Sequence, residues 1–132
     1  MTSLWKSRTH IEWYQRQPED IRLEIPGHTT TAGLAHTEEV CRYLWNHHIA
    51  AIAGDNFAVE VWPPDRGPGS DQFGSLHRIL IGQFGMALGE LFWLKDLADD
   101  CARDGVYEFF FAASPLNVPG GIGSTANALA IK

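Results

Sequence analysis

The sequence predicts a single α/β domain, and three observations lead to that class. Two segments repeat apolar residues at helical spacing, several short apolar runs have the length of buried strands, and clusters of proline and glycine separate these segments. Alternation of helices with apolar strands is typical of α/β or α+β proteins. A chain of 132 residues is long enough for one hydrophobic core and too short for two ordinary domains. We therefore expect residues 1–132 to form one domain.

The N-terminal part is predicted to contain a helical turn, a connection and a longer helix. Residues 11–17 have the pattern of a helical turn, and Pro18 together with EIPGHTTTAG (residues 24–33) indicates an extended, turn-rich connection. Thr37 is a suitable N-cap, because two glutamates follow it at the positive end of a helix dipole. Apolar and aromatic residues then recur at helical spacing, which predicts an amphipathic helix over residues 38–48.

The middle of the chain is predicted to alternate strands, a loop and one further helix. The small apolar run at residues 49–53 is typical of a buried strand that ends in a Gly-Asp turn. Prolines and glycines make residues 62–74 a loop. Ser75 then begins a helix over residues 76–83, and a glycine interrupts it, so we expect MALGEL (residues 86–91) to be extended.

The C-terminal third is predicted to contain a helix and two strands. The helix carries an apolar face that includes Leu94 and ends at Gly105. Residues 106–114 form a strand with apolar residues on both faces, as in a sheet that is covered on both sides. PGGIGST (residues 119–125) lacks the Gly-Lys-Ser/Thr ending of a phosphate loop and precedes a predicted closing strand at 126–132. We therefore expect a structural turn there, because a phosphate site needs a helix N-terminus.

Composition and charge exclude several classes of function. The formal charge of −6 and the lack of a basic cluster argue against a nucleic-acid partner, which requires a surplus of Lys and Arg. No apolar run reaches the roughly 18 residues of a membrane span, and the N-terminal residues lack the apolar segment of a secretory signal. Cys41 and Cys101 lie in apolar-periodic segments, which favours buried, reduced thiols and a cytoplasmic protein.

Two polar residues flank the otherwise apolar stretch LHRILIGQFGMALGEL (residues 76–91). His77 and Glu90 are both residue types that bind zinc or manganese, but they could equally be surface residues at the edges of a buried segment. Their spacing alone leaves both interpretations open. The other histidines within the chain lack a metal-binding spacing, and we expect helix-end or solvated positions for them; they include His28, His36, His47 and His48.

Six blocks of sequence occur together in an order that is characteristic of one enzyme family. These blocks are PGHTTTAGL, WNHHIAAIAGDN, AVEVWPP, LHRILIGQFGMALGEL, LADDCARDGVYEFFFAASPLNVPGGIGS and ANALAIK. From about Trp13 onward the chain resembles the C-terminal portion of the cyclase family of metal-dependent hydrolases, which includes bacterial kynurenine formamidase and isatin hydrolase. The combination of blocks is far more specific than any one of them, and it covers most of the chain.

The resemblance implies a fold, a cofactor and two ligands. The fold would be the swivelling β/β/α architecture of that family in an incomplete form, and the cofactor a divalent zinc or manganese ion. The LHR and GEL blocks match a histidine and a glutamate ligand, so the resemblance implies His77 and Glu90 as metal ligands. The family's HxGTHxDxPxH motif, which supplies the other ligands and the catalytic histidine, does not occur here, so the catalytic residue is unknown. Residues 1–12 are an atypical lead, and we expect a truncated or split chain.

The resemblance also suggests which residues would surround the metal. Asp55 and Asn56, at the end of a predicted strand, would support the ligands through hydrogen bonds, or would only form the Gly-Asp-Asn turn. Trp62, Phe84 and Trp93 would line an aromatic substrate pocket, or would pack in the core.

The implied function is hydrolysis of a carbon–nitrogen bond in a small amide or cyclic amide, as by an arylformamidase of tryptophan catabolism. This chain would be inactive without the missing segment. We expect it to form a homo-oligomer or to bind a complementary N-terminal segment. The alternative is a non-catalytic structural or oligomerisation domain that is derived from the same fold.

Overall fold

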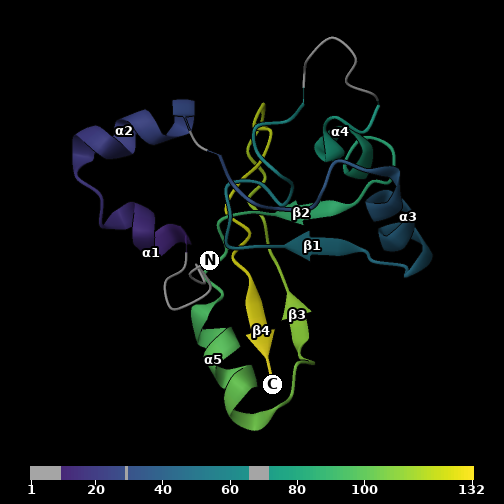
Figure 1. Cartoon of the computed structure of the whole chain (residues 1–132). Helices are drawn as coiled ribbons and strands as arrows, with labels where there is room; N and C mark the ends of the chain where they lie inside the picture. Colours follow the sequence, from purple (N-terminus) through teal and green to yellow (C-terminus); the bar gives the residue numbers. More distant parts are fainter. Residues whose placement is uncertain (1–9, 29, 66–71) are drawn as a thin grey trace, which may run out of the picture. The chain divides into compact units, whose positions relative to one another are not determined.

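The computed structural model describes residues 10–28, 30–65 and 72–132; most of the atypical lead lies outside them. The helices are α1 (His10–Gln15), α2 (Glu19–His28), α3 (Glu38–Asn46), α4 (Leu76–Leu80) and α5 (Lys95–Asp104), and the strands are β1 (Ala51–Ala53), β2 (Ala87–Gly89), β3 (Phe110–Ala112) and β4 (Leu129–Ile131) (Figure 1). Contacts divide the chain into two compact units, a first unit that ends at Leu94 and a second unit formed by Lys95–Lys132.

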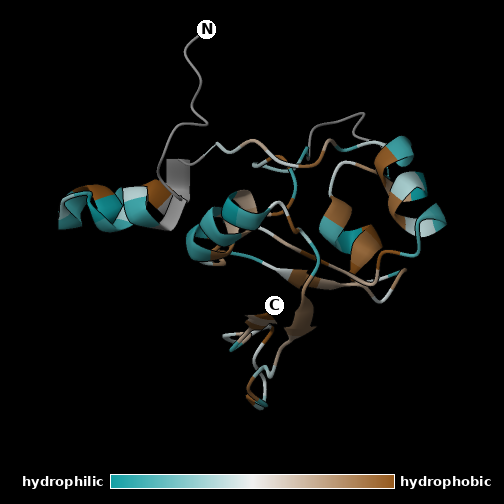
Figure 2. Cartoon of the chain, turned by 90° about the horizontal axis from the view of Figure 1, so that it is seen from below, coloured by the Kyte–Doolittle hydropathy of each residue, from teal (hydrophilic) through white to brown (hydrophobic). Residues whose placement is uncertain are grey.

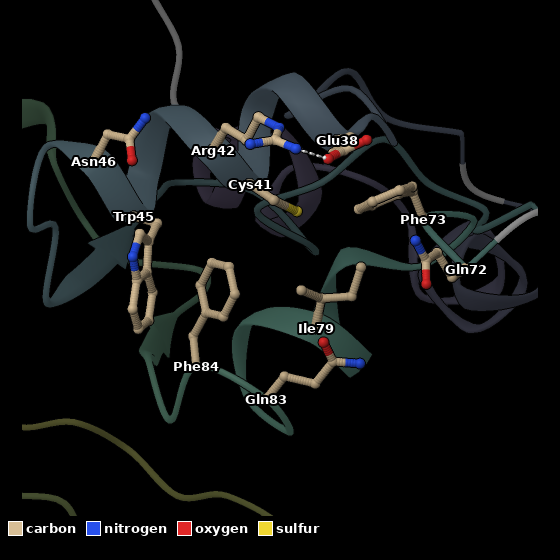
Figure 3. Close-up of a pocket in the computed structure, with 10 residues that line it drawn as sticks. All are labelled: Glu38, Cys41, Arg42, Trp45, Asn46, Gln72, Phe73, Ile79, Gln83 and Phe84. Atoms are coloured by element: carbon tan, nitrogen blue, oxygen red, sulfur yellow. Dashed lines mark ion pairs between the residues drawn. The ribbon is translucent and has the colours of Figure 1, made fainter.

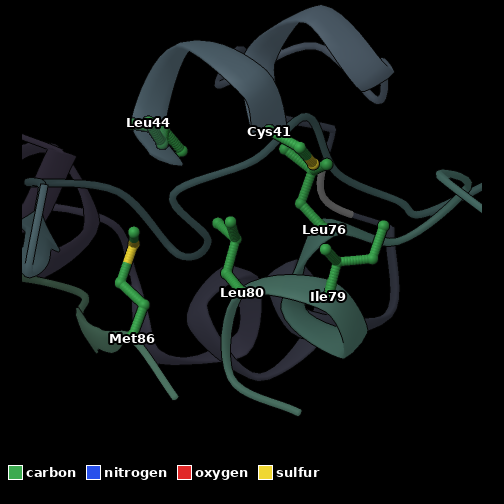
Figure 4. Packing of buried hydrophobic residues seen from close by; sticks show 6 residues of the cluster. All are labelled: Cys41, Leu44, Leu76, Ile79, Leu80 and Met86. Carbon is green, nitrogen blue, oxygen red and sulfur yellow. The ribbon is translucent and has the colours of Figure 1, made fainter. Parts of the chain in front are cut away.

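The hydrophobic core of the first unit lies between α3 and α4. The Thr37 hydroxyl accepts a hydrogen bond from the Val40 N–H at 3.4 Å, so the predicted N-cap of α3 is confirmed. The buried cluster that these helices share is shown in Figure 4 and contains Cys41, Leu44, Leu76, Ile79, Leu80 and Met86. Complete burial of one such leucine side chain contributes about 1.5–3 kcal/mol, which makes this cluster the main source of stability in the first unit.

Strands β1 and β2 form a parallel pair beside this core. Ala51 lies opposite Ala87, and Ile52 opposite Leu88, and the latter two side chains pack against the buried cluster. Parallel strands accompanied by helices fit the predicted α/β class. The predicted strand at residues 49–53 and the extended MALGEL segment are therefore confirmed in shorter form.

A second backbone ladder holds residues 31–34 against residues 59–62. The Leu34 N–H donates to the Val59 carbonyl at 2.9 Å, and the Val61 N–H donates to the Leu34 carbonyl at 3.0 Å. A side chain at Gly33 would overlap the backbone carbonyl of Glu60, so only glycine permits this close approach. The ladder turns the side chain of Glu60 into the interior of the first unit, where it is fully buried.

The second unit contains helix α5 and an antiparallel ribbon of β3 and β4. The helix stops at Gly105 as predicted, because this residue adopts a φ of 73°. Phe110 lies opposite Ile131, and Ala112 lies opposite Leu129. The predicted strand at residues 106–114 is shortened to three residues. The prediction that both of its faces are covered is wrong within this unit, since Phe110 is 67% exposed. Figure 2 shows the hydrophobic colouring of the strands near the C-terminus.

The largest difference from the predicted secondary structure is helix α2. Residues 24–33 were expected to be extended, but residues 19–28 form a helix. Pro18 precedes this helix, and its carbonyl accepts a hydrogen bond from the Arg22 N–H at 2.9 Å. Proline is well tolerated at a helix start, and two acidic residues in the first turn favour the helix dipole, whereas Pro26 falls near the end of the helix.

Two further predictions concern the cysteines and membrane spans. Both cysteines are free and buried, as expected. None of the helices in the described ranges combines the length and the apolar character that crossing a bilayer would require.

Candidate functional site

The fold brings His77 and Glu90 into direct contact in the first unit. Nε2 of His77 lies 2.9 Å from Oε1 of Glu90, and Nδ1 of the same ring contacts Oε1 of Glu60. The imidazole therefore lies between two carboxylates. Since only one of these carboxylates was predicted from the sequence, the site contains more than the predicted pair.

Glu60 holds the start of helix α4 as well as the His77 ring. Its carboxylate accepts hydrogen bonds from the backbone N–H groups of Leu76 and His77, the latter at 3.2 Å, and its Oε1 lies 3.4 Å from the Ser75 hydroxyl. Ser75 occupies the N-cap position but makes no side-chain cap bond to the helix backbone. A carboxylate supplied from elsewhere in the chain thus satisfies the N–H groups that a helix start leaves unpaired.

The pKa of Glu60 is lowered in the folded protein. Burial on its own would raise this pKa, because it penalises the charged form. The hydrogen bonds from the Leu76 N–H and from the ring and backbone of His77, together with the electrostatic interaction with His77, outweigh burial. Glu60 is consequently held as a carboxylate that accepts hydrogen bonds and does not donate them.

A second histidine lies against the other oxygen of Glu60. Nε2 of His36 is 2.8 Å from Oε2, but the contact does not have hydrogen-bond geometry. The His36 side chain is 14% exposed. The predicted solvated position of His36 is therefore wrong, because the ladder of residues 31–34 carries this segment past Glu60.

Glu90 is positioned by the end of strand β2. Its Oε1 accepts a hydrogen bond from the Val59 N–H at 3.1 Å. The next residue, Leu91, has a φ of 55°, and its N–H donates to the Asn56 carbonyl at 2.9 Å. The loops that follow β1 and β2 are thereby joined at the carboxyl ends of two parallel strands, which is where α/β sheets commonly place functional groups.

The His77–Glu90 contact has the geometry of two positions around a metal ion. Zinc binds histidine nitrogen and carboxylate oxygen at about 2.0–2.2 Å, so two ligand atoms of one ion lie roughly 3 Å apart. A carboxylate on the other ring nitrogen, as Glu60 is here, commonly orients a histidine ligand. Among the residues that the structure describes, no group of three or more His, Cys, Asp or Glu side chains is arranged to hold a metal. The donor set therefore fits two positions of a metal shell.

The two residues predicted to support the ligands lie after β1. The Asn56 side-chain amide donates to the Ala32 carbonyl and its oxygen accepts from the Phe57 N–H at 2.8 Å. These bonds fix the turn after β1. The Asn56 carbonyl of this turn accepts the hydrogen bond from Leu91, the residue next to Glu90. The role of Asp55 stays a prediction.

The predicted aromatic residues lie in different places. Phe84 lines a cavity of about 480 Å³ between α3 and α4, where its ring centroid is 5.0 Å from that of Trp45 (Figure 3). Ile79 also lines this cavity. Ile79 follows His77 by two positions, about 200° around a helix, so the cavity opens on the opposite side of α4.

The two predicted pocket tryptophans lie elsewhere, and Trp62 belongs to the backbone ladder with Thr31. Trp93 is 46% exposed, and the substrate-pocket roles stay predictions.

Sequence reasoning missed Glu60 and His36. The signal for Glu60 was present, because it is a single carboxylate within the apolar run FAVEVW (residues 57–62). A charge in such a run is rarely buried unless it is paired. No comparable signal existed for His36, whose contact depends on a ladder that pairs Thr31 with Trp62 and Leu34 with Glu60.

Comparison with known proteins supports the resemblance in part. No protein-family model and no curated protein matches the chain. Among solved structures, a crystal structure described as that of a novel cyclase matches with a TM-score of 0.68 and 32% sequence identity. The match covers 92% of this chain and 37% of that chain. This chain is therefore similar to a cyclase over most of its own length and spans little more than a third of the solved protein.

Proposed function

We propose that this chain contributes part of the metal site of a cyclase-like, metal-dependent hydrolase, with His77 and Glu90 as two of the ligands. The observation that carries the proposal is the 2.9 Å approach of the His77 Nε2 atom to the Glu90 carboxylate, with Glu60 on the opposite ring nitrogen. The similarity to a solved cyclase supports the cyclase-like part of the proposal. The remaining ligands and the catalytic histidine would come from outside this chain, in the swivelling β/β/α architecture that the resemblance implies.

Glu60 prepares His77 for this role. When the ring donates from Nδ1 to the buried carboxylate, its Nε2 lone pair is free to bind a cation. In the absence of a cation, the contact between Nε2 and Glu90 requires a proton between the two atoms. We therefore expect metal uptake to release that proton.

The substrate class follows from the resemblance. The chemistry that bound zinc or manganese would supply is activation of water and polarisation of a carbonyl group. An amide or cyclic amide of a small molecule, with an aromatic ring as in the arylformamidases, is the proposed substrate. Within this chain, Glu90 is held by the Val59 N–H and His77 by Glu60, so both proposed ligands are oriented before the cation binds.

Elemental analysis of the purified chain tests the proposal directly. The chain is loaded with zinc or manganese, dialysed, and compared with the His77→Ala/Glu90→Ala variant. A matched control, His47→Ala/Glu39→Ala, removes the same residue types from the exposed ends of α3. Because this chain supplies only two ligands, we expect partial retention of metal by the chain and the control, and clearly less metal in the site variant. Metal content that is equal in all three proteins would reject the ligand assignment.

The Glu60→Gln variant sharpens this test. It keeps the size of the side chain but replaces one acceptor oxygen with a donor group, so it disturbs the orientation of His77. Loss of such a supporting hydrogen bond typically lowers metal affinity 10–100-fold. Proton release on metal addition, measured in weakly buffered solution, provides a second readout that does not depend on activity.

The second candidate function is a non-catalytic structural or oligomerisation domain. It is favoured by one observation, that the described part of the chain contains no group of three or more His, Cys, Asp or Glu side chains arranged to hold a metal. On this alternative the His77 ring would only connect two carboxylates. It predicts no metal uptake and a loss of stability in the His77→Ala variant that added zinc or manganese does not change.

A further inference from the structure

His36 lies against a buried carboxylate without completing a hydrogen bond to it. Its Nε2 atom is 2.8 Å from Oε2 of Glu60, and the Glu60 side chain is fully buried. Within the described ranges, this nitrogen is a buried polar atom without a hydrogen-bond partner. Nearly all buried polar groups in folded proteins are paired, so an unpaired nitrogen beside a carboxylate is an exception that requires a physical cause. Both residues belong to the first unit.

The acceptor positions of Glu60 show what His36 can contribute. A carboxylate accepts hydrogen bonds at about four positions, two on each oxygen. Oε1 accepts from the ring and from the backbone N–H of His77, and the Ser75 hydroxyl lies at the longer distance of 3.4 Å. Oε2 accepts from the Leu76 N–H. A second position on Oε2 remains, and His36 lies beside that oxygen.

Backbone contacts on both sides hold His36 in this place. Two residues before it, Leu34 pairs with the segment of Glu60 through the ladder. One residue after it, Thr37 caps helix α3, and the Thr37 N–H donates to the Ala35 carbonyl at 2.8 Å. The approach of His36 to Glu60 is therefore set by the backbone, and it does not depend on a long side chain that rotates freely.

The short contact also specifies where the His36 ring carries a hydrogen. A neutral imidazole has a hydrogen on one nitrogen and a lone pair on the other. If Nε2 presented its lone pair, two acceptor atoms would meet at 2.8 Å in the interior, where they would repel each other strongly. Nε2 therefore carries a hydrogen. Rotation about the last side-chain bond of histidine has a broad energy profile, so a rotation of the ring can direct this hydrogen at Oε2.

We propose that His36 is a positioning residue of the His77–Glu90 site, which donates from Nε2 to Oε2 of Glu60 and so prevents rotation of the carboxylate. The terminal bond of a glutamate side chain rotates easily, and donors on both oxygens restrict it. With Glu60 fixed, Oε1 stays on Nδ1 of His77, and Nε2 of that ring stays directed at Glu90. The inference deepens the proposed function and rests on it for the metal assay alone.

Two variants of His36 separate hydrogen donation from filling of space. His36→Leu fills much of the same volume without a donor, whereas His36→Gln keeps an N–H group at the end of the side chain. The readout is proton NMR of the metal-free chain, because the Nδ1 proton of His77 is held by a buried carboxylate and should exchange slowly with water. We expect this proton to exchange about tenfold faster or more in His36→Leu, and within about threefold of the unmodified chain in His36→Gln.

A core variant distinguishes positioning from a general loss of stability. Ile79→Val shortens a buried side chain on the same helix as His77 and removes none of the contacts of Glu60 named above. It is expected to keep the slow exchange of the His77 proton. Exchange that is unchanged in His36→Leu, or equally fast in His36→Leu and His36→Gln, would overturn the proposal. Equally fast exchange in Ile79→Val and His36→Leu would overturn it as well.

The unmodified chain provides a test that does not depend on the folding of any variant. Nitrogen NMR reports directly which ring nitrogen of His36 carries the hydrogen. A hydrogen on Nε2 that exchanges slowly with water is the expected result. A His36 ring whose Nε2 carries no hydrogen would overturn the proposal.

Zinc affinity, measured by competition with a chromophoric chelator, connects His36 to the metal site. We expect it to fall about threefold to tenfold in His36→Leu, less than the roughly 10–100-fold loss for a residue that touches a ligand directly. An unchanged zinc affinity in this variant would overturn the proposal. A chain that binds no zinc would refute the ligand assignment instead, and the exchange of the His77 proton in the metal-free chain would still decide the role of His36.

Discussion

The two units of this chain differ in how far they bury their apolar residues. In the first unit the apolar faces of α3, α4 and the β1–β2 pair meet in one buried cluster. In the second unit, all of which is described, Cys101 is the buried hydrophobic residue, and the phenylalanines of β3 remain exposed. Polar groups differ in the same sense, since the first unit buries Glu60 whereas the second places Asp104 at its surface.

This difference shows that an apolar strand is buried only when a second layer is available to cover it. The first unit supplies its own layers, because helices pack on the strands that lie next to them in sequence. The second unit supplies one helix and two strands, and its apolar faces exceed what these elements cover.

Replacing Glu60 with alanine is expected to have the largest effect. It leaves the His77 ring and the N–H groups at the start of α4 without their partner inside the first unit. Breaking a buried charged pair in this way typically costs about 3–5 kcal/mol. All five tryptophans lie in the first 94 residues, so urea unfolding followed by tryptophan fluorescence reports on the first unit. A loss no larger than that of the exposed control Glu108→Ala would show that Glu60 does not support α4.

Shortening one leucine in each unit tests the contrast itself. Leu80→Ala creates a cavity in the buried cluster and is expected to cost about 2–5 kcal/mol. Leu129→Ala removes a side chain that is 61% exposed and is expected to change stability by about 0.5 kcal/mol or less. Chemical denaturation of both variants, followed by circular dichroism, measures the difference. Equal losses would mean that the β3–β4 ribbon is already covered in solution.

The two helices of the core are expected to respond differently to loss of the residue at their N-cap position. Thr37→Ala removes a hydroxyl that caps α3 and is expected to cost about 1 kcal/mol. Ser75→Ala is expected to cost less, because Glu60 caps α4 in its place. Thermal unfolding of the two variants under identical conditions decides this. A larger loss for Ser75→Ala than for Thr37→Ala would contradict the role of Glu60 as the cap.

The smallest effect is expected at the surface ion pair of the second unit. The hydrogen bond from Lys132, followed by that from the Val106 N–H, lowers the pKa of Asp104 from its ordinary value of 3.8. A lowered folded-state pKa stabilises the fold above the ordinary value, and this contribution is lost as the pH falls through the folded value. An NMR titration of Lys132→Met is expected to show the pKa of Asp104 raised toward 3.8. An unchanged pKa would exclude the Lys132 contact in solution.

Much of the local structure could be predicted because it depends on neighbouring residues. The cap at Thr37, the amphipathic helix after it and the stop at Gly105 depend on local backbone chemistry and were predicted correctly. Helix α2 was missed because Pro18 and Pro26 were interpreted as signs of an extended segment. In the structure Pro18 lies just before the helix, where proline is tolerated. Pro26 lies within the helix near its end, a position that proline does not favour, so this signal was outweighed.

The site could be predicted only in part, because it is assembled from distant segments. The contact of His77 with Glu90 agrees with the pair that the resemblance suggested. Glu60 reaches His77 across 17 positions and His36 reaches Glu60 across a ladder, and no periodic pattern encodes such contacts. A run of apolar residues on both faces predicted a strand over residues 106–114, and the structure forms a strand at Phe110–Ala112, but such a run does not specify which layer covers the strand.

The double attachment of Glu60 restricts what this position can tolerate in evolution or in engineering. Its two oxygens serve the first backbone amides of α4 and the ring of His77 together. Aspartate would be one methylene too short to reach both, and glutamine would present a donor where an acceptor is required. The start of helix α4 and the orientation of the His77 ring therefore depend on the same side chain. If a library of all residues at position 60 were selected for stable folding, we expect glutamate to be recovered almost exclusively.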